Sequence, residues 1–154
     1  SVLDQFGARY RFDNESFIVE SNEYKPFEFD ATDCPDLFPA LVVLASKAIG
    51  TSKIHGVDRL FMKESNRALT LKSEFTKLGL DINIIDNYMI INGKGTLTGG
   101  IISSHYDHRI AMAGAIACLV TSDPIYIENH EVVSKSYPKF YEHLQSFGVK
   151  LTNQ

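Results

Sequence analysis

The chain has 154 residues, 44% of them hydrophobic and 22% charged, which is the composition of about one globular domain with a buried core. Its formal net charge of −4, without a Lys/Arg-rich block, argues against a nucleic-acid partner, although a local basic cluster can still bind a small anion. No stretch has the pattern of a signal peptide or the length of a membrane span. We therefore expect a cytoplasmic protein with no membrane partner.

The first half of the chain alternates between the two-residue period of strands and the 3.6-residue period of helices. The predicted strands cover residues 8–20, as a hairpin turning at 13–16, then 27–31 and 52–57. The predicted helices cover residues 36–49 and 64–78, ended by Gly50 and Gly79. One face of the second helix is apolar at 3-4-3 spacing and is predicted to be buried: Ala68, Leu71, Phe75 and Leu78.

The second half repeats this alternation. Its predicted strands cover residues 81–92, as a hairpin turning at 86–87, then 99–102, 124–129 and 149–152. An apolar helix is predicted over residues 107–120, and a last helix begins at an N-cap on Ser136 and ends at Gly148. The last helix is predicted to bury one stripe: Tyr137, Phe140, Tyr141, Leu144 and Phe147.

The element order recurs at a fixed offset. Asp36 stands 72 residues before His108, and Lys63 stands 72 residues before Lys135. The two hairpin turns are separated by about the same number of residues. Self-similarity of this kind predicts an α/β (α+β) fold made of pseudo-symmetric repeats, each ordered strand–helix–strand–helix–strand–strand.

The register of the repeat predicts three segments. Residues 1–22 would be the closing hairpin of a preceding unit, 23–94 a complete unit and 95–154 the last unit. We therefore expect the chain to be the truncated part of a longer domain. The two cysteines follow no pairing pattern, so free thiols in a reducing compartment are expected at Cys34 and Cys118.

Basic residues stand at three of the four predicted helix entrances, although a helix N-terminus already carries positive partial charge. If pseudo-symmetry brings these entrances to one side, the cations, the helix dipoles and the free N–H groups form an anion site. Acidic residues in such a site have lowered pKa values and can exchange protons. The pattern therefore predicts an anionic, phosphorylated ligand near Lys63, Arg67, His108, Arg109 and Lys135, with Asp36 and Glu64 beside them.

Plainer interpretations of the same residues remain open. Asp36 is compatible with a helix-capping role, and Asp107 is the obvious N-cap of its helix. Lys63, Glu64 and Arg67 share helical spacings and are compatible with a solvated, salt-bridged helix face.

Several motifs together resemble one enzyme family. They are DCPDLFPALVVLA (33–45), KESNR (63–67) followed by LGLDI (78–82), YDHRIAMAGAIA (106–117) and SKSYPKFYEHL (134–144). In this order and spacing they resemble roughly the C-terminal third of the 5-enolpyruvylshikimate-3-phosphate synthases. The resemblance implies an inside-out α/β barrel domain of βαβαββ units, here truncated, and a missing N-terminal domain of the same enzyme as partner.

The same resemblance implies a reaction of the shikimate pathway, which leads to chorismate and the aromatic amino acids. The enolpyruvyl group of phosphoenolpyruvate would pass to the 5-hydroxyl of shikimate 3-phosphate by addition and elimination, releasing phosphate. Neither a metal nor an organic cofactor is implied.

The resemblance also implies roles for individual residues. Asp36 would contact the shikimate hydroxyl and act as a base, with Lys63 beside that hydroxyl. Glu64 would protonate the methylene carbon of phosphoenolpyruvate and later remove that proton. The phosphoenolpyruvate-binding residues would be Arg67 and Arg109 on its carboxylate, with His108 and Lys135 lining its site. Arg59 would join Asp36 and Lys63 at shikimate 3-phosphate.

Three alternatives accompany this hypothesis. The family alternative is a fragment similar to UDP-N-acetylglucosamine enolpyruvyl transferase. The others are a non-catalytic anion-binding module and a purely structural α/β domain. If the synthase hypothesis is correct, this chain alone should be inactive, because the rest of the acceptor site lies in the other domain.

Overall fold

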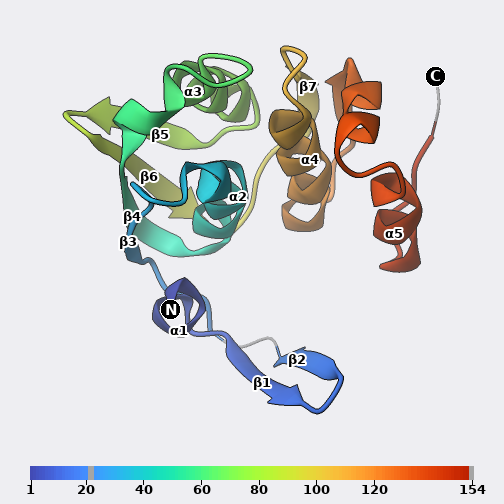
Figure 1. Cartoon of the computed structure of the whole chain (residues 1–154), viewed down its shortest axis with the longest axis horizontal. Coiled ribbons are helices and arrows are strands. Elements are labelled where there is room, and N and C mark those ends of the chain that lie inside the picture. The colour runs from blue at the N-terminus through green and yellow to red at the C-terminus, as the bar shows by residue number, and fades with distance from the viewer. Residues whose placement is uncertain (21–22, 153–154) are drawn as a thin grey trace.

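The computed structural model describes residues 1–20 and 23–152 (Figure 1). Their strands form three separate sheets, none of them closed into a barrel. In Figure 1 the largest sheet lies on the left with α2 and α3, the segments from β7 to α5 lie on the right, and the β1–β2 hairpin projects below. The predicted mixed α/β fold is confirmed.

The N-terminal segment forms a short helix and a hairpin. Helix α1 (Val2–Phe6) precedes β1 (Arg9–Asp13) and β2 (Ser16–Glu20), which pair antiparallel as predicted. The rings of Tyr10, Phe12 and Phe17 cluster on this hairpin, and those of Phe12 and Phe17 are largely exposed.

The central sheet has four strands in the order β3-β4-β6-β5. They are β3 (Glu28–Asp30), β4 (Ile49–His55), β5 (Asp81–Ile85) and β6 (Tyr88–Lys94). β3 and β4 are parallel, as a helical crossover between them requires, whereas β4–β6 and β5–β6 are antiparallel. The predicted hairpin at 86–87 is confirmed, and Asp86 takes the positive φ of 52° that its tight turn needs.

The first long helix is shorter than predicted. The 3-10 helix η1 (Pro35–Leu37) leads into α2 (Phe38–Lys47), and β4 already begins at Ile49. Gly50 therefore lies in a strand and does not end the helix. Because Gly93 on β6 has no side chain, the carbonyls of Ala45 and Ala48 at the end of α2 can approach it.

Helix α3 (Arg67–Lys77) begins three residues later than predicted. The Asn66 side chain accepts a hydrogen bond from the backbone N–H of Leu69, which makes Asn66 the N-cap. Lys63 and Glu64 thus precede the helix, and the alternative interpretation of a salt-bridged helix face does not hold. The predicted apolar face is fully buried, and Gly79, with φ of 81°, follows the helix end as predicted.

The C-terminal part is built around two parallel strands, β7 (Gly100–Ser103) and β8 (Ile125–Glu128). Between them run α4 (His108–Ala117) and the 3-10 helix η3 (Cys118–Val120), with Asp107 as the predicted N-cap. The chain continues through the 3-10 helix η4 (His130–Lys135) to α5 (Phe140–Ser146). A core of apolar side chains joins α2, α3, α4 and the central sheet.

Predictions for the last segment were partly wrong. Helix α5 starts at Phe140, after a turn over residues 136–139, and Ser136 ends η4 instead of capping α5. Phe140 and Leu144 are buried, but Tyr137 is 42% and Phe147 79% exposed. Residues 149–152 form no strand, because no neighbouring strand in the described ranges lies beside them.

The remaining predictions concern the cysteines, the membrane spans and the boundaries of the repeat units. Both cysteines are free, as expected. None of the helices in residues 1–20 and 23–152 is long and apolar enough to cross a membrane. The element order of residues 28–94 is strand–helix–strand–helix–strand–strand, but the unit boundaries stay a prediction. Parts of the first and last predicted units, residues 21–22 and 153–154, lie outside the described residues.

Candidate active site

Half of the predicted site residues come from the starts of three helical segments that meet at one place. Asp36 lies in η1, Arg67 is the first residue of α3, and His108 and Arg109 are the first two residues of α4. Lys63 stands in the turn that follows the 3-10 helix η2 (Val57–Leu60) and precedes α3, as does Glu64.

Asp36 is the centre of the basic cluster. Its Oδ1 accepts a hydrogen bond from Arg67 Nη1 at 2.8 Å and lies 3.4 Å from Lys63 Nζ, and its Oδ2 lies 3.2 Å from Arg109 Nη2. Partial burial raises the pKa of Asp36, but the Arg67 hydrogen bond and the charges of Arg109 and Lys63 outweigh it and hold the pKa below its ordinary value. Asp36 is therefore an ionised carboxylate at neutral pH.

Arg67 and Asp107 form a buried two-point ion pair. Arg67 Nε donates to Asp107 Oδ2 at 2.9 Å, and Nη2 donates to Oδ1 at 3.1 Å. Asp107 is fully buried and Arg67 is 2% exposed. Burial raises the pKa of Asp107. The hydrogen bond and charge of Arg67, the Arg109 backbone N–H and the Ser65 hydroxyl outweigh this effect and hold the pKa below its ordinary value, so the carboxyl stays ionised.

This burial changes the expectation for Arg67. In this arrangement its guanidinium contacts Asp36 and Asp107 and is hidden from solvent. Arg109 is 36% exposed and Lys63 29% exposed, so these two are the accessible cations of the cluster.

Glu64 and His108 form a pair at the edge of the cluster. Glu64 Oε2 lies 2.9 Å from His108 Nδ1 and also accepts from the His108 backbone N–H at 3.3 Å. An ionised carboxylate only accepts hydrogen bonds, so His108 Nδ1 is the donor in this contact.

Three groups near this edge have the ligand types of a metal site. Glu64, Asp107 and His108 offer atoms within 4.8 Å of one another. However, Asp107 already accepts hydrogen bonds from Arg67, Ser65 and the Arg109 backbone, and cations surround the set. Positive neighbours and an occupied carboxylate do not suit a metal cation.

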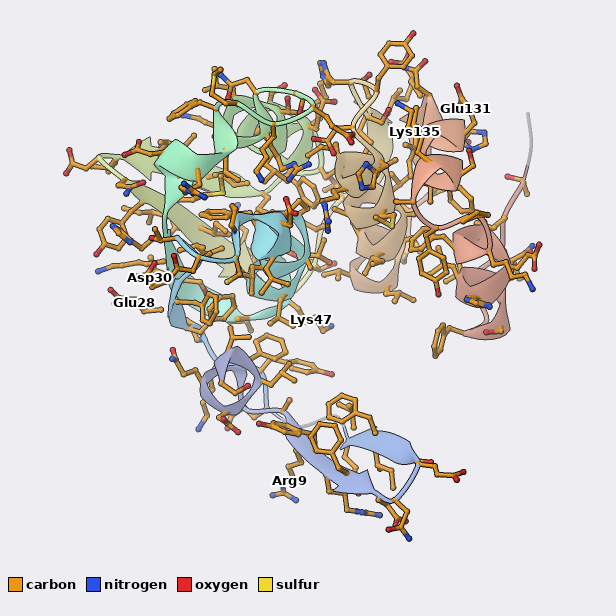
Figure 2. The ribbon with its side chains drawn as sticks, in the orientation of Figure 1. Arg9, Glu28, Asp30, Lys47, Glu131 and Lys135 are labelled. Atoms are coloured by element: carbon orange, nitrogen blue, oxygen red, sulfur yellow. The ribbon has the colours of Figure 1, made fainter. Side chains whose placement is uncertain are left out.

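Two predicted residues stand apart from these contacts. Lys135, the last residue of η4, is exposed and lies between the ribbons of α4 and η4 in the view of Figure 2. Arg59 is exposed on η2, which packs against η1 and thus against the element that carries Asp36. Neither forms an ion pair within the described ranges.

The charges of the cluster nearly cancel. Lys63, Arg67 and Arg109 face the carboxylates of Asp36, Asp107 and Glu64. The predicted meeting of helix starts therefore forms, but the cations of this cluster are already paired inside the chain. An anionic ligand would have to exchange with the accessible half of this network, at Asp36, Lys63 and Arg109.

Sequence reasoning missed Asp107 as a site residue and treated it as a cap only. It does cap α4, accepting from the Arg109 backbone N–H at 3.0 Å, and it also binds Arg67. The available signal was the position of Arg67: it precedes Leu71 of the predicted buried face by four residues, and a cation on a buried face requires a buried anion.

Comparison with known proteins gives the family. A family model described as EPSP synthase (3-phosphoshikimate 1-carboxyvinyltransferase) matches residues 1–144. The chain belongs to this family. Of the two enolpyruvyl transferase families considered from the sequence, the synthase is the one supported.

Relatives of the EPSP synthase family match almost all of this chain. The 3-phosphoshikimate 1-carboxyvinyltransferases of Clostridium novyi and Clostridium kluyveri are 37% and 44% identical to it over 147 residues. Each match covers 96% of this chain but 34% of the relative. The chain thus spans about a third of the length of these relatives.

Solved structures agree with this placement. EPSP synthase from Acinetobacter baumannii is similar with a TM-score of 0.78 and 32% identity, over 95% of this chain and 37% of that one. The enolpyruvyl transferase NikO from Streptomyces tendae has a TM-score of 0.74 at 20% identity, over 96% of this chain and 34% of that one, a likeness of fold alone.

Proposed function

We propose that this chain carries the phosphoenolpyruvate side of the active site of a 3-phosphoshikimate 1-carboxyvinyltransferase. The observation that carries the proposal is the contact of one ionised carboxylate, Asp36, with three cations drawn from separate segments. Family membership supplies the substrates. The remaining part of the protein would complete the site for shikimate 3-phosphate.

The reaction moves the enolpyruvyl group without a redox change. The 5-hydroxyl oxygen of shikimate 3-phosphate attacks C2 of phosphoenolpyruvate while C3 gains a proton, giving a tetrahedral adduct. The C2–O bond to phosphate then breaks and C3 returns a proton, so enolpyruvyl ether and inorganic phosphate leave. Both halves need a proton donor–acceptor at C3 and an acceptor for the hydroxyl proton.

Asp36 and Glu64 are the proposed proton-transfer groups. Asp36 takes the hydroxyl proton, and its lowered pKa supports an ionised resting form. Lys63, at 3.4 Å from Asp36, stabilises the alkoxide-like oxygen. Glu64 exchanges the proton at C3, and its contact with His108 Nδ1 supports a fixed orientation of the carboxylate.

Cations would hold the substrate's negative charges. Arg109 is suited to the carboxylate of phosphoenolpyruvate because guanidinium makes forked contacts. Lys135 lines the phosphate end, where it stabilises the leaving group, and His108 in its doubly protonated form donates there from Nε2 while Nδ1 stays on Glu64. Arg67 would act indirectly, by holding Asp36 and Asp107, and Arg59 would bind shikimate 3-phosphate.

The proposal also includes a cytoplasmic location. The two free cysteines support it, because free thiols are typical of reducing compartments.

The experiment is a phosphate-release assay on the full-length protein with phosphoenolpyruvate and shikimate 3-phosphate. Release should require both substrates, and Asp36→Asn should lower kcat by about a hundredfold or more, as loss of a general base does. Asp58→Asn, an exposed aspartate on η2, is the matched control and should match the wild type. No release by the full-length wild type would refute the proposal.

The chain alone gives a second arm of the same assay. Because it spans about a third of its relatives' length, it should show no turnover. Steady product formation by the isolated chain would contradict the division of the site proposed above.

A further inference from the structure

A second buried carboxylate, Glu74, lies outside the cluster described above. It stands on α3, and its side chain is 1% exposed. Its oxygens accept four hydrogen bonds, two from α3, one from the end of β7 and one from the residues that follow β7. The donors are Ser73 Oγ at 2.8 Å, Lys77 Nζ at 2.7 Å, the Ser103 backbone N–H at 2.8 Å and His105 Nε2 at 3.1 Å.

Ser103 is the last residue of β7, and His105 lies in the connection between β7 and α4. There His105 and Tyr106 both have positive φ, 49° and 59°, a region that side-chain-bearing residues seldom occupy in succession. A backbone of this kind persists only where surrounding contacts hold it. The Ser103 and Ser104 hydroxyls accept from the next-but-one backbone N–H groups at 3.2 Å, and Glu74 binds the connection from outside.

This connection leads directly into the start of α4. Directly after Tyr106 come Asp107, His108 and Arg109. The two adjoining φ angles therefore set the direction in which the His108 ring and the Arg109 side chain leave the backbone.

Helix α3 holds both ends of the connection. Arg67 and Glu74 are seven residues apart, about two helical turns, and so lie on the same face of α3. Arg67 binds Asp107 at one end, and Glu74 binds Ser103 and His105 at the other. Two buried charges of opposite sign thus hold one short segment.

We propose that Glu74 and His105 are positioning residues, which hold the β7–α4 connection so that His108 and Arg109 meet the phosphoenolpyruvate anion. This inference rests on the proposed function for the identity of the anion. The hydrogen bond that matters is the one from His105 Nε2, because it ties the first positive-φ residue of the connection to α3. Neither residue touches substrate.

A merely stabilising role predicts something different. In that case loss of the His105 contact would lower the amount of folded protein, and with it Vmax, and would leave the KM values for both substrates unchanged. A positioning role affects the substrate held by α4 and spares the acceptor.

The test uses the full-length protein with three variants. His105→Phe keeps a ring and removes the donor, and His105→Gln restores an N–H donor. Lys77→Met, which has no N–H donor, removes a Glu74 partner that lies on α3 itself. His105→Phe should raise the KM for phosphoenolpyruvate about tenfold, the usual scale of one lost hydrogen bond to a charged group. The KM for shikimate 3-phosphate should stay within about twofold in all three, and His105→Gln should recover most of the loss.

Hydrogen–deuterium exchange gives a readout that does not depend on turnover. His105→Phe should speed exchange of the backbone amides from Ser103 to Arg109 and leave those of α2 unchanged. A wild-type protein without turnover would refute the proposed function while this exchange pattern still tested the positioning. The positioning proposal is overturned if His105→Phe behaves as Lys77→Met does. It is also overturned if His105→Phe lowers Vmax with both KM values unchanged and speeds exchange throughout the chain.

Discussion

Arg67 and Asp107, 40 residues apart in the sequence, join the first residue of α3 to the N-cap of α4 through two hydrogen bonds of 2.9 and 3.1 Å. The pair is almost wholly shielded from water. It fixes how two helix starts meet and thereby where Asp36, His108 and Arg109 lie.

Breaking this pair should be costly. Arg67→Ala leaves the Asp107 charge buried without its main partner, so the free energy of unfolding should fall by about 3–5 kcal/mol. Arg11→Ala removes an exposed ion pair with Glu20 on the β1–β2 hairpin and should cost less than about 1 kcal/mol. Urea denaturation measures both, and equal losses would show that the buried pair contributes nothing special.

Acidification should remove the contribution of ionised Glu74 to the free energy of unfolding. Burial raises the pKa of this carboxyl, but the hydrogen bonds from Lys77, the Ser103 backbone and His105 outweigh it and lower the pKa from 4.5 to about 2. Because the folded pKa is lowered, the unfolded chain binds the proton first. The Glu74 contribution is full above pH 4.5 and is lost as pH falls towards 2, by about 3 kcal/mol at most.

Denaturation of wild type and Glu74→Gln between pH 7 and pH 3 checks this. The wild type should lose stability faster than the variant below about pH 4.5, where the free carboxyl begins to bind protons. Parallel curves would contradict a lowered pKa at Glu74.

Gly93 should resist substitution. A Cβ there would meet the carbonyl oxygens of Ala45 and Ala48, which are backbone atoms that cannot turn aside. Gly93→Ala should therefore cost about 1–3 kcal/mol, as overpacking does. Gly100→Ala, whose Cβ meets its nearest atom at 3.4 Å, is the control and should change the melting temperature little. A similar melting temperature for both variants would show that α2 can move away from β6.

Glu64→Gln should separate chemistry from binding. Gln retains an oxygen that can accept from His108 but cannot exchange a proton at C3. We expect kcat of the full-length protein to fall by about 10²–10⁴ with the KM for phosphoenolpyruvate nearly unchanged. Glu28→Gln, an exposed residue of β3 shown at the left of Figure 2, is the control and should have wild-type kcat. An unchanged kcat for Glu64→Gln would remove Glu64 from the mechanism.

Local patterns predicted much of the fold. The hairpin turns, the buried face of α3 and the cap at Asp107 depend on neighbours within a few residues, which periodicity and capping preferences describe. The late start of α3 was missed because Asn66, and not an earlier residue, satisfies the free N–H of Leu69. Phe147 was assigned to the core because helical spacing does not tell which side of a helix finds a partner.

The sequence predicted which residues form the candidate site better than it predicted the contacts between them. The repeat and the motifs identified Asp36, Lys63 and Arg109, which do meet. The burial of Arg67 by Asp107 depends on the packing of α3 against α4, and no local signal encodes that distance. Lys135 has the sequence offset of a site residue, yet η4 leaves it exposed and outside the ion pairs of the cluster.

The most direct test of the central claim is a crystal structure of the full-length protein with phosphoenolpyruvate and a non-reacting analogue of shikimate 3-phosphate. The account predicts that the phosphoenolpyruvate carboxylate lies within hydrogen-bonding distance of Arg109, and its phosphate near His108 Nε2 and Lys135. Phosphoenolpyruvate bound away from the starts of α3 and α4, with Asp36, Lys63 and Arg109 still paired only to one another, would contradict it.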